Sequence, residues 1–329
     1  MDDLRWFAPN RYCALPVPAL RAAGLRIAES GDAPARIAVA ADGQCAVAGF
    51  EYAARHRCPL ILYLWDLPPW RLGDGRPDPM FGLGARIIRI PRPFGGYRER
   101  AGYYSRIRFV ARRATAVWCP SQQTSADVAE RFGVATRQLP FCYDSDRFNA
   151  FSATARTAQA VPTLLAIARL VPSKNHVVLL RAAAQLPRPV MVRIIGRGPE
   201  GESLTRSASA LGVTLRLDDG WANDEEIVAA YREAAVVVCP SRFEGFGLTP
   251  MEGLVMGRTV VASAIPVHRE FVEGLVRLFE PDDADQLARH CAEALDAPAP
   301  TLPAISPLPE LTIEACAERI STALEPLLR

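Results

Sequence analysis

The chain has 329 residues, of which half are hydrophobic and 22% are charged, and its formal net charge is +2. This length predicts two domains with separate cores, and the small net charge excludes a polyelectrolyte role for the whole chain. No apolar run reaches the roughly 18 residues that span a bilayer, and the first residues do not resemble a signal peptide, so we expect a cytoplasmic protein.

Short apolar segments alternate with alanine-rich helical segments along the chain. In the first half we expect strands at 4–8, 36–40, 60–65, 85–90, 115–119 and 136–140. In the second half we expect strands at 163–168, 190–195, 214–217, 236–239 and 259–262. Helices are expected between them, for example at 177–185, 225–234 and 284–295. The alternation predicts an α/β fold with parallel sheets covered on both faces.

The expected elements divide into two doubly wound, Rossmann-like domains that face each other across a cleft. The first comprises residues 1–150, and the second comprises residues 161–305. Residues 151–160 are small and polar and are expected to form a linker, whereas residues 306–329 form a helix that could pack back on the first domain. In such sheets ligands bind at the carboxyl ends of the strands, so the loops at those ends are the candidate sites.

The loop after the strand at 236–239 is the most informative one, and it reads PSRFEGFGLTPME. Thr249 is a candidate N-cap, with Pro250 at the first helical position and Glu252 completing a capping box. Gly245 and Gly247 let the backbone approach a ligand, and a helix N-terminus after such a turn suits a diphosphate.

Two carboxylates bracket this turn. Glu244 and Glu252 are eight residues apart and could hold sugar hydroxyls on either side of a diphosphate. The alternative is a well-capped helix after a surface turn. That alternative accounts for Thr249, Pro250 and Glu252, but it explains neither Glu244 nor the two glycines.

Two further turns follow expected strands. In the first, Ser173 could cap a helix, and Arg169 and Lys174 could stabilise the charge of a leaving diphosphate. An ordinary solvated turn is the alternative. In the second turn, Gly196 and Gly198 form a GxG pattern, for which a tight turn without ligand is the simpler interpretation.

The segment from Arg86 to Arg113 is basic and aromatic. It contains nine arginines and one acidic residue, so its charge of +8 leaves −6 on the rest of the chain. This asymmetry suggests an anionic membrane surface or a lipid-linked acceptor, with Arg98 and Arg106 as candidate contacts and a peripheral location at the inner face of the membrane. Nucleic acid is disfavoured because no binding motif accompanies the charge. A solvated helix face is the other alternative.

Cysteine and histidine spacing predicts no zinc site. None of the eight cysteines forms a CxxC pair, and no two of the four histidines have the spacing of metal ligands. We therefore expect the cysteines to be small buried hydrophobic residues rather than a disulfide framework.

Several motifs together resemble one family. The segment EGFGLTPME resembles the E-x7-E motif of the retaining glycosyltransferases of family 4, also called group 1. Other segments that resemble elements of that family are ARLVPSKN, IIGRGPE, GRTVVASAIPVHREFV, LFEPDDADQLA, CPSQQTSADVAERFGV and LPFCYDSDRF. The resemblance covers roughly residues 115–295.

This resemblance implies a GT-B fold, transfer with anomeric retention, a nucleotide-sugar donor, and no metal or other cofactor. The first domain would face a glycan or lipid-linked acceptor, and the second would bind the donor. Glu244 would contact the transferred sugar, Glu252 the ribose, and Arg169 and Lys174 the diphosphate. Further donor contacts implied by the motifs are Gly245, Phe246, Gly247, Gly196, Gly198 and Glu270.

The first domain departs from the family pattern at three loops. No glycine pair follows the first strand, where Asn10 and Arg11 are candidate acceptor contacts. Trp65 stands where the family often has histidine, which leaves Asp66 as a candidate catalytic residue, and the Asn-Gly of a third loop is absent at 141–143.

Three functions remain open at this stage. The first is a retaining glycosyltransferase of cell-envelope polysaccharide or glycolipid synthesis. The second is a catalytically silent relative that binds a glycan or a partner. The third is a GT-B enzyme of another reaction type, such as a phosphorylase or an epimerase.

Overall fold

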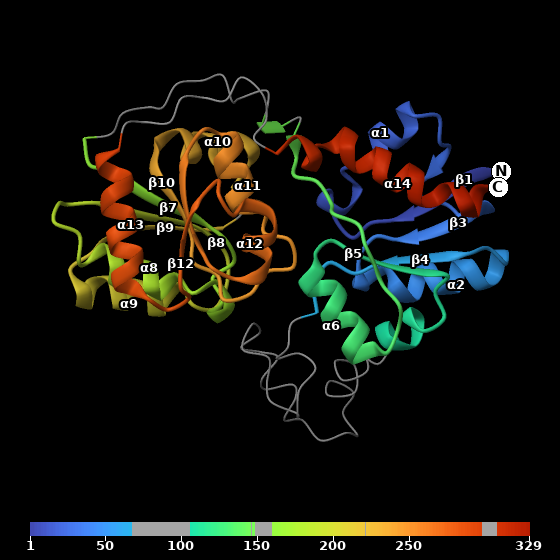
Figure 1. Ribbon diagram of the computed structural model, residues 1–329, viewed down its shortest axis with the longest axis horizontal. Helices are drawn as coiled ribbons and strands as arrows, with labels where there is room; N and C mark the ends of the chain where they lie inside the picture. Colours follow the sequence, from blue (N-terminus) through green and yellow to red (C-terminus); the bar gives the residue numbers. More distant parts are fainter. Residues whose placement is uncertain (68–105, 146, 149–159, 221, 298–307) are drawn as a thin grey trace. The chain divides into compact units, whose positions relative to one another are not determined.

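The computed structural model describes residues 1–67, 106–145, 147–148, 160–220, 222–297 and 308–329 (Figure 1). These residues form two compact units. One contains the described residues up to Asp144 together with Pro309–Arg329, and the other runs from Ser145 to Leu308. The expected strand at 85–90, Arg98 and nearly all of the expected linker lie outside the described residues.

The N-terminal unit contains a parallel sheet of six strands. They are β1 (Asp2–Phe7), β2 (Ile27–Ala28), β3 (Ala35–Ala40), β4 (Leu60–Tyr63), β5 (Ala116–Cys119) and β6 (Arg137–Gln138). Their order is β2-β1-β3-β4-β5-β6. Strand β2 therefore lies on one side of β1, and β3 lies on the other side. The strand order reverses between β1 and β3.

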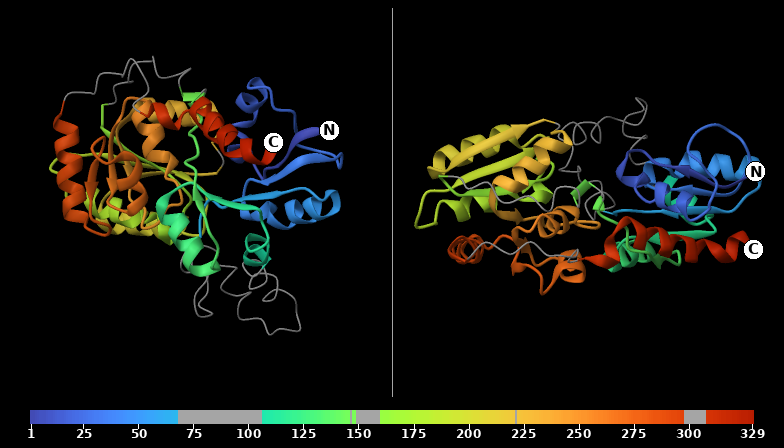
Figure 2. Two further views of the ribbon diagram at one scale, coloured as in Figure 1. Left: turned by 45° about the vertical axis from the view of Figure 1, so that its right-hand side comes forward. Right: turned by 90° about the horizontal axis from the view of Figure 1, so that it is seen from above.

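Helices complete the core of this unit. Helices α2 (Ala46–His56) and α6 (Gln122–Phe132), with the helical segment 106–111, share an apolar cluster with β3, β4 and β5. Helix α1 (Val17–Ala22) packs with α14 (Ile313–Leu328), which also contacts β3 (Figure 2).

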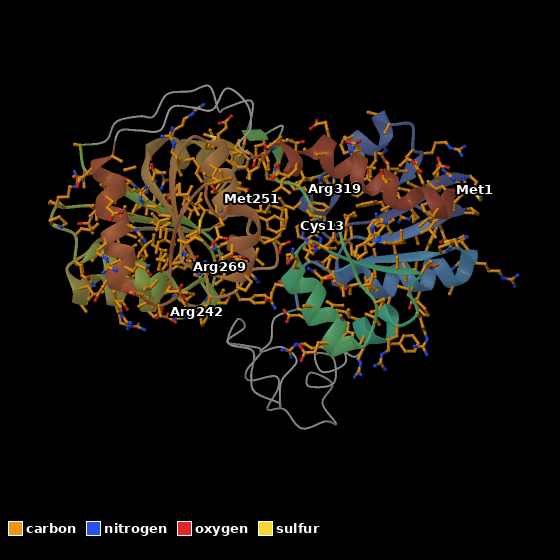
Figure 3. All side chains as sticks on the ribbon, viewed as in Figure 1. Met1, Cys13, Arg242, Met251, Arg269 and Arg319 are labelled. Atoms are coloured by element: carbon orange, nitrogen blue, oxygen red, sulfur yellow. The ribbon has the colours of Figure 1, made fainter. Side chains whose placement is uncertain are left out.

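The C-terminal helix is bound to the N-terminal unit by polar contacts as well as by packing. Arg319, labelled on α14 in Figure 3, donates hydrogen bonds to the carbonyl oxygens of Pro140 (3.1 Å) and Phe141 (3.3 Å). The amide of Tyr143 donates to the carbonyl of Leu311 at 3.2 Å. The N-terminal unit is consequently built from both ends of the sequence.

The C-terminal unit contains a second parallel sheet of six strands. They are β7 (Thr163–Ile167), β8 (Met191–Gly196), β9 (Thr214–Asp219), β10 (Ala234–Cys239), β11 (Thr259–Ser263) and β12 (Arg277–Phe279). Their order is β12-β11-β10-β7-β8-β9. Here the order reverses between β7 and β10, which pair in parallel with Leu165 opposite Val237.

The six described helices of this unit divide between the two faces of its sheet. Helices α8 (His176–Ala183), α9 (Gly201–Leu211) and α13 (Ala284–Asp296) share one apolar cluster with the strands. Right-handed crossovers place α10 (Asp224–Glu233), α11 (Leu248–Val255) and α12 (Pro266–Val272) on the opposite face.

The predicted doubly wound α/β architecture is therefore confirmed for each unit. The short strands β2 and β12 were not predicted, because two or three residues carry too little pattern. No described helix combines the length and the apolar character that crossing a membrane would require.

Two strand-end turns of the C-terminal sheet touch through their backbones. The amide of Leu170 donates to the carbonyl of Arg197 at 3.0 Å, and the amide of Glu200 donates to the carbonyl of Leu170 at 3.1 Å. A Cβ atom on Gly196 would lie 1.9 Å from the carbonyl oxygen of Ala168. A Cβ atom on Gly198 would lie 2.3 Å from the carbonyl oxygen of Leu170. Both glycines are thus required by the close approach of the turn that follows β7.

Substitution of Gly196 by alanine should therefore destabilise the protein, by about 1–3 kcal/mol for an overpacked site. The matched control is Gly220→Ala, because a Cβ there would meet no atom within 4 Å. Thermal unfolding of the two variants checks this expectation. An unchanged Tm for Gly196→Ala would mean that the two turns do not pack as described.

Candidate functional site

The candidate site of the C-terminal unit lies at the reversal of strand order between β7 and β10. In open α/β sheets the loops at such a position diverge and leave room for a ligand. The loop after β7 carries Arg169 and Lys174, and the loop after β10 carries Glu244. Neighbouring parallel strands end at the same edge of the sheet, so residues distant in sequence meet here.

Hydrogen bonds join these two loops directly. The backbone amide of Arg242 donates to the carbonyl of Ser173 at 2.8 Å, and its guanidinium donates to the carbonyl of Pro172 at 2.8 Å. The same guanidinium forms an ion pair of 2.5 Å with Asp282. Arg242, labelled in Figure 3, thereby fixes the loop after β10 against the loop after β7.

Glu244 is held by one cation and one hydroxyl. Its Oε1 atom lies 2.5 Å from Nζ of Lys174 and accepts a hydrogen bond of 2.6 Å from the hydroxyl of Ser241. Burial raises the pKa of Glu244, but the charge and hydrogen bond of Lys174 and the bond from Ser241 outweigh it, and the pKa is lowered. Glu244 is therefore an ionised carboxylate with a fixed orientation.

The predicted capping box at the start of α11 is wrong. The helix begins at Leu248, and its N-cap is Gly247, whose φ of 77° lies in the left-handed region that favours glycine. The hydroxyl of Thr249 donates to the carbonyl of Ile167 at 3.0 Å instead of capping the helix. Pro250 consequently lies within the first turn of α11, two residues after its start.

Glu252 also has a different partner from the predicted one. It is buried, and its Oε2 accepts a hydrogen bond of 2.8 Å from the phenol of Tyr231 on α10. Burial, together with the neighbouring carboxylate, raises the pKa of Tyr231 well above its usual value, so the phenol stays protonated and remains a donor. This contact joins α10 to α11.

The prediction that Ser173 caps a helix is wrong as well. Residues Pro172–Lys174 form a short 3-10 turn, and α8 begins after Asn175, which has a left-handed φ of 54° and is 1% exposed. The side chain of Asn175 donates to Asp282 at 3.0 Å. Arg169, by contrast, is exposed, and its side chain forms no hydrogen bond or ion pair with another described residue.

The remaining predicted donor residues have varied surroundings. The ring of Phe246 is buried and packs edge to face on Phe271, with the ring centres 5.0 Å apart. Gly245 is partly exposed in the loop before α11, and Glu270 is partly exposed on α12. Gly196 and Gly198 serve the turn packing described above. Within the described parts of the chain, no group of three or more His, Cys, Asp or Glu side chains could hold a metal ion.

The predicted residues of the N-terminal unit lie after β1 and β4. Asn10 is exposed, and its side-chain oxygen accepts a hydrogen bond of 3.2 Å from the amide of Cys13, while Arg11 lies over the ring of Tyr12. Asp66 is partly buried beyond the end of β4.

Trp65 occupies the place where the family often has histidine. Its indole donates to the carbonyl of Ala41 at 2.8 Å, and its ring centre lies 4.3 Å from that of Phe141. That position is therefore filled by an internally bonded aromatic side chain.

The described arginines of the basic segment have two kinds of surroundings. Arg112 donates to the carbonyl of Phe132 at 2.8 Å, and Arg113 lies 3.6 Å from the ring centre of Phe109. Arg106 and Arg108 are exposed. Arg112 and Arg113 thus contact other residues of the unit, whereas the side chains of Arg106 and Arg108 are exposed to solvent.

The sequence interpretation missed Ser241, Tyr231 and His268. Ser241 lies three residues before Glu244, but a serine after a strand is an ordinary turn residue. Tyr231 belongs to a helix with no recognised motif. His268 lies in a segment that resembles the family, but no motif assigns it a role, and it has no histidine partner at a metal-ligand spacing.

The contact between Tyr231 and Glu252 leads to a prediction. Tyr231→Phe removes the phenol that donates to Oε2 of the buried Glu252 carboxylate and should reduce stability by about 1–3 kcal/mol. Thermal unfolding checks this, with Tyr12→Phe as the control because the hydroxyl of Tyr12 bonds to no described residue. A neutral effect of Tyr231→Phe would show that the phenol does not support Glu252.

Known proteins share both the sequence motifs and the fold. Residues 150–305 match the family described as glycosyl transferases group 1. The D-inositol 3-phosphate glycosyltransferase of Saccharomonospora viridis is 37% identical over 47% of this chain and 42% of its own length. The MMP α-(1→4)-mannosyltransferase of Mycolicibacterium hassiacum is 28% identical over 61% of this chain and 50% of its own length. The chain spans about half of these two curated relatives or less.

A solved structure shares the whole fold. Anabaena HepE, determined in complex with UDP and glucose, has a TM-score of 0.71 with 15% identity, and the match covers 99% of this chain and 100% of HepE. At this identity the likeness concerns the fold. Residues 150–305 thus resemble the glycosyl transferases group 1, and the chain shares the two-domain fold of HepE.

Proposed function

We propose that this chain is a retaining glycosyltransferase that moves a sugar from a nucleotide-diphosphate donor to a glycan or lipid-linked acceptor. The observation that carries the proposal is Glu244, an oriented carboxylate that Lys174 and Ser241 hold beside the N-terminus of α11. A carboxylate suits sugar hydroxyls, and a helix N-terminus suits a diphosphate.

The diphosphate is assigned to the loop between β10 and α11. The free amides at the start of α11 carry partial positive charge, and Gly247 leaves the backbone uncovered by a side chain. Lys174 lies beside this loop, because its ammonium group forms an ion pair with Glu244. Arg169 belongs to the adjoining loop, which follows β7. These two cations would offset the charge that develops on the leaving nucleoside diphosphate, so the reaction is proposed to need no metal.

The transferred sugar is assigned to Glu244. Lys174 and Ser241 both bond to Oε1, and no described residue hydrogen-bonds to Oε2. Oε2 is therefore the atom proposed to accept from a sugar hydroxyl. Glu252 is proposed to accept hydrogen bonds from the ribose hydroxyls, although its Oε2 atom already accepts one from the phenol of Tyr231.

The donor and acceptor classes are proposed from the relatives. HepE was solved with UDP and glucose, and one Mycolicibacterium smegmatis relative is described as GDP-mannose-dependent, which supports a nucleotide sugar and leaves the base open. A D-inositol 3-phosphate glycosyltransferase and a serotype-specific mannosyltransferase among the relatives support a role in polysaccharide or glycolipid synthesis. Residues 86–113 are proposed to contact an anionic membrane surface.

A second candidate function rests on Trp65. Because this residue fills the place of the family histidine with internal contacts, a protein that binds donor or glycan without transfer is the alternative. Release of free sugar from a nucleotide-sugar donor in the absence of acceptor distinguishes the two. Donor binding without any release or transfer would favour the silent relative.

The test of the enzyme proposal uses Arg169→Ala. A panel of nucleotide sugars is first screened by thermal shift, because a bound donor raises Tm. Arg169 has no described partner, so its loss should leave Tm unchanged while lowering kcat/KM by roughly 10²-fold. The matched control is Arg206→Ala on α9, which removes an exposed arginine that pairs with Glu202. Equal kcat/KM for both variants and the wild type would remove Arg169 from the site.

A companion variant, Glu244→Gln, tests the sugar contact. The sequence alone gave Glu244 no structural role, but the structure shows that its charge balances Lys174. We therefore expect a lower Tm together with a large loss of kcat, and assays are run well below the Tm of the variant. Transfer at the wild-type rate in the folded variant would contradict the assignment.

A further inference from the structure

His268 is a buried side chain whose two ring nitrogens have different surroundings. It lies on α12 and is 1% exposed. Its Nδ1 atom is 2.8 Å from the carbonyl oxygen of Ser263 and 3.3 Å from the hydroxyl of the same residue. Its Nε2 atom is buried and has no hydrogen-bond partner among the described residues.

The surrounding hydrogen bonds determine which nitrogen carries the proton. The hydroxyl of Ser263 donates to the carbonyl of Ser241 at 2.5 Å, so its hydrogen is already used. Both neighbours of Nδ1 can then only accept, and Nδ1 must be the protonated nitrogen. In the neutral ring, Nε2 consequently carries a lone pair, which makes it a buried acceptor without a donor.

This acceptor faces the proposed donor site. A Cβ atom on Gly247, the N-cap of α11, would lie 3.4 Å from Nε2 and 3.2 Å from Cδ2 of His268. Glu244 is near enough for its charge to act on the ring. An unsatisfied buried acceptor costs free energy, so an atom of this kind beside a candidate ligand site points to a partner that the protein itself does not supply.

We propose that Nε2 of His268 accepts a hydrogen bond from a hydroxyl group of the transferred sugar, an inference that rests on the proposed function. His268 would then be a residue that determines donor-sugar binding. With Oε2 of Glu244, it would provide two acceptors at the loop that precedes α11. Two neighbouring acceptors match two hydroxyl groups of a sugar ring.

The chemistry favours a hydroxyl over a phosphate as the partner. Burial lowers the pKa of His268, and Lys174 lowers it further, while Glu244 opposes the shift without reversing it. The ring is therefore neutral near pH 7, and its Nε2 lone pair repels phosphate oxygens. A hydroxyl group can donate to that lone pair, whereas a fully ionised diphosphate cannot.

The experiment compares a nucleotide sugar with its nucleoside diphosphate. His268→Asn can keep a donor for Ser263 at the place of Nδ1 but removes Nε2, whereas His268→Gln can present an amide oxygen near the place of Nε2. Dissociation constants are measured by calorimetry for the nucleotide sugar found in the thermal-shift screen and for the same nucleotide without sugar. The Tm of each variant confirms folding.

We expect His268→Asn to lower the affinity for the nucleotide sugar about 10-fold, because one hydrogen bond is lost. The affinity for the nucleoside diphosphate should change less than 2-fold. His268→Gln should recover part of the loss. Equal weakening of both ligands would place the contact on the shared nucleotide part and overturn the proposal. Unchanged affinity for both would also overturn it while leaving the glycosyltransferase assignment intact. A wild-type protein that binds no nucleotide ligand would instead refute the proposed function itself.

Discussion

The parallel pairing of β7 with β10 is the constraint on which the candidate site depends. It brings together two loops whose key residues, Lys174 and Glu244, are separated by 70 positions in the sequence. Once the strands are adjacent, their loops leave the same edge and close on each other through Arg242. The ion pair then forms at a place that the sheet has already fixed.

The Lys174–Glu244 pair should also make this site sensitive to substitution. Both side chains are largely buried, with 13% and 19% of their surfaces exposed. Removing one partner of a buried pair leaves an uncompensated charge, which costs about 3–5 kcal/mol, whereas the intact pair adds little net stability. The structural effect of the pair is to fix geometry, since it holds a cation and a carboxylate together beside the start of α11.

The amino-acid pattern predicted the fold far better than it predicted the local bonds. Long apolar strands and amphipathic helices are repeated signals, and they correctly indicated two doubly wound domains. The start of α11 was misjudged because Thr249, a residue that commonly caps helices, bonds to the carbonyl of Ile167 on another strand. Glu252 likewise bonds to Tyr231 on another helix. Contacts of this kind depend on tertiary neighbours that no local spacing encodes, and the same holds for His268.

The return of the chain to its first domain has a consequence for biosynthesis. The strands of the C-terminal unit all lie between Thr163 and Phe279, so they have all left the ribosome before α14 is synthesised and released. The N-terminal unit begins earlier but lacks α14, whose Arg319 binds the carbonyls of Pro140 and Phe141. Domains of nascent chains usually complete their folding in order from the N-terminus. In this protein the domain that is translated first receives its last element, α14, only after every strand of the second domain has been translated.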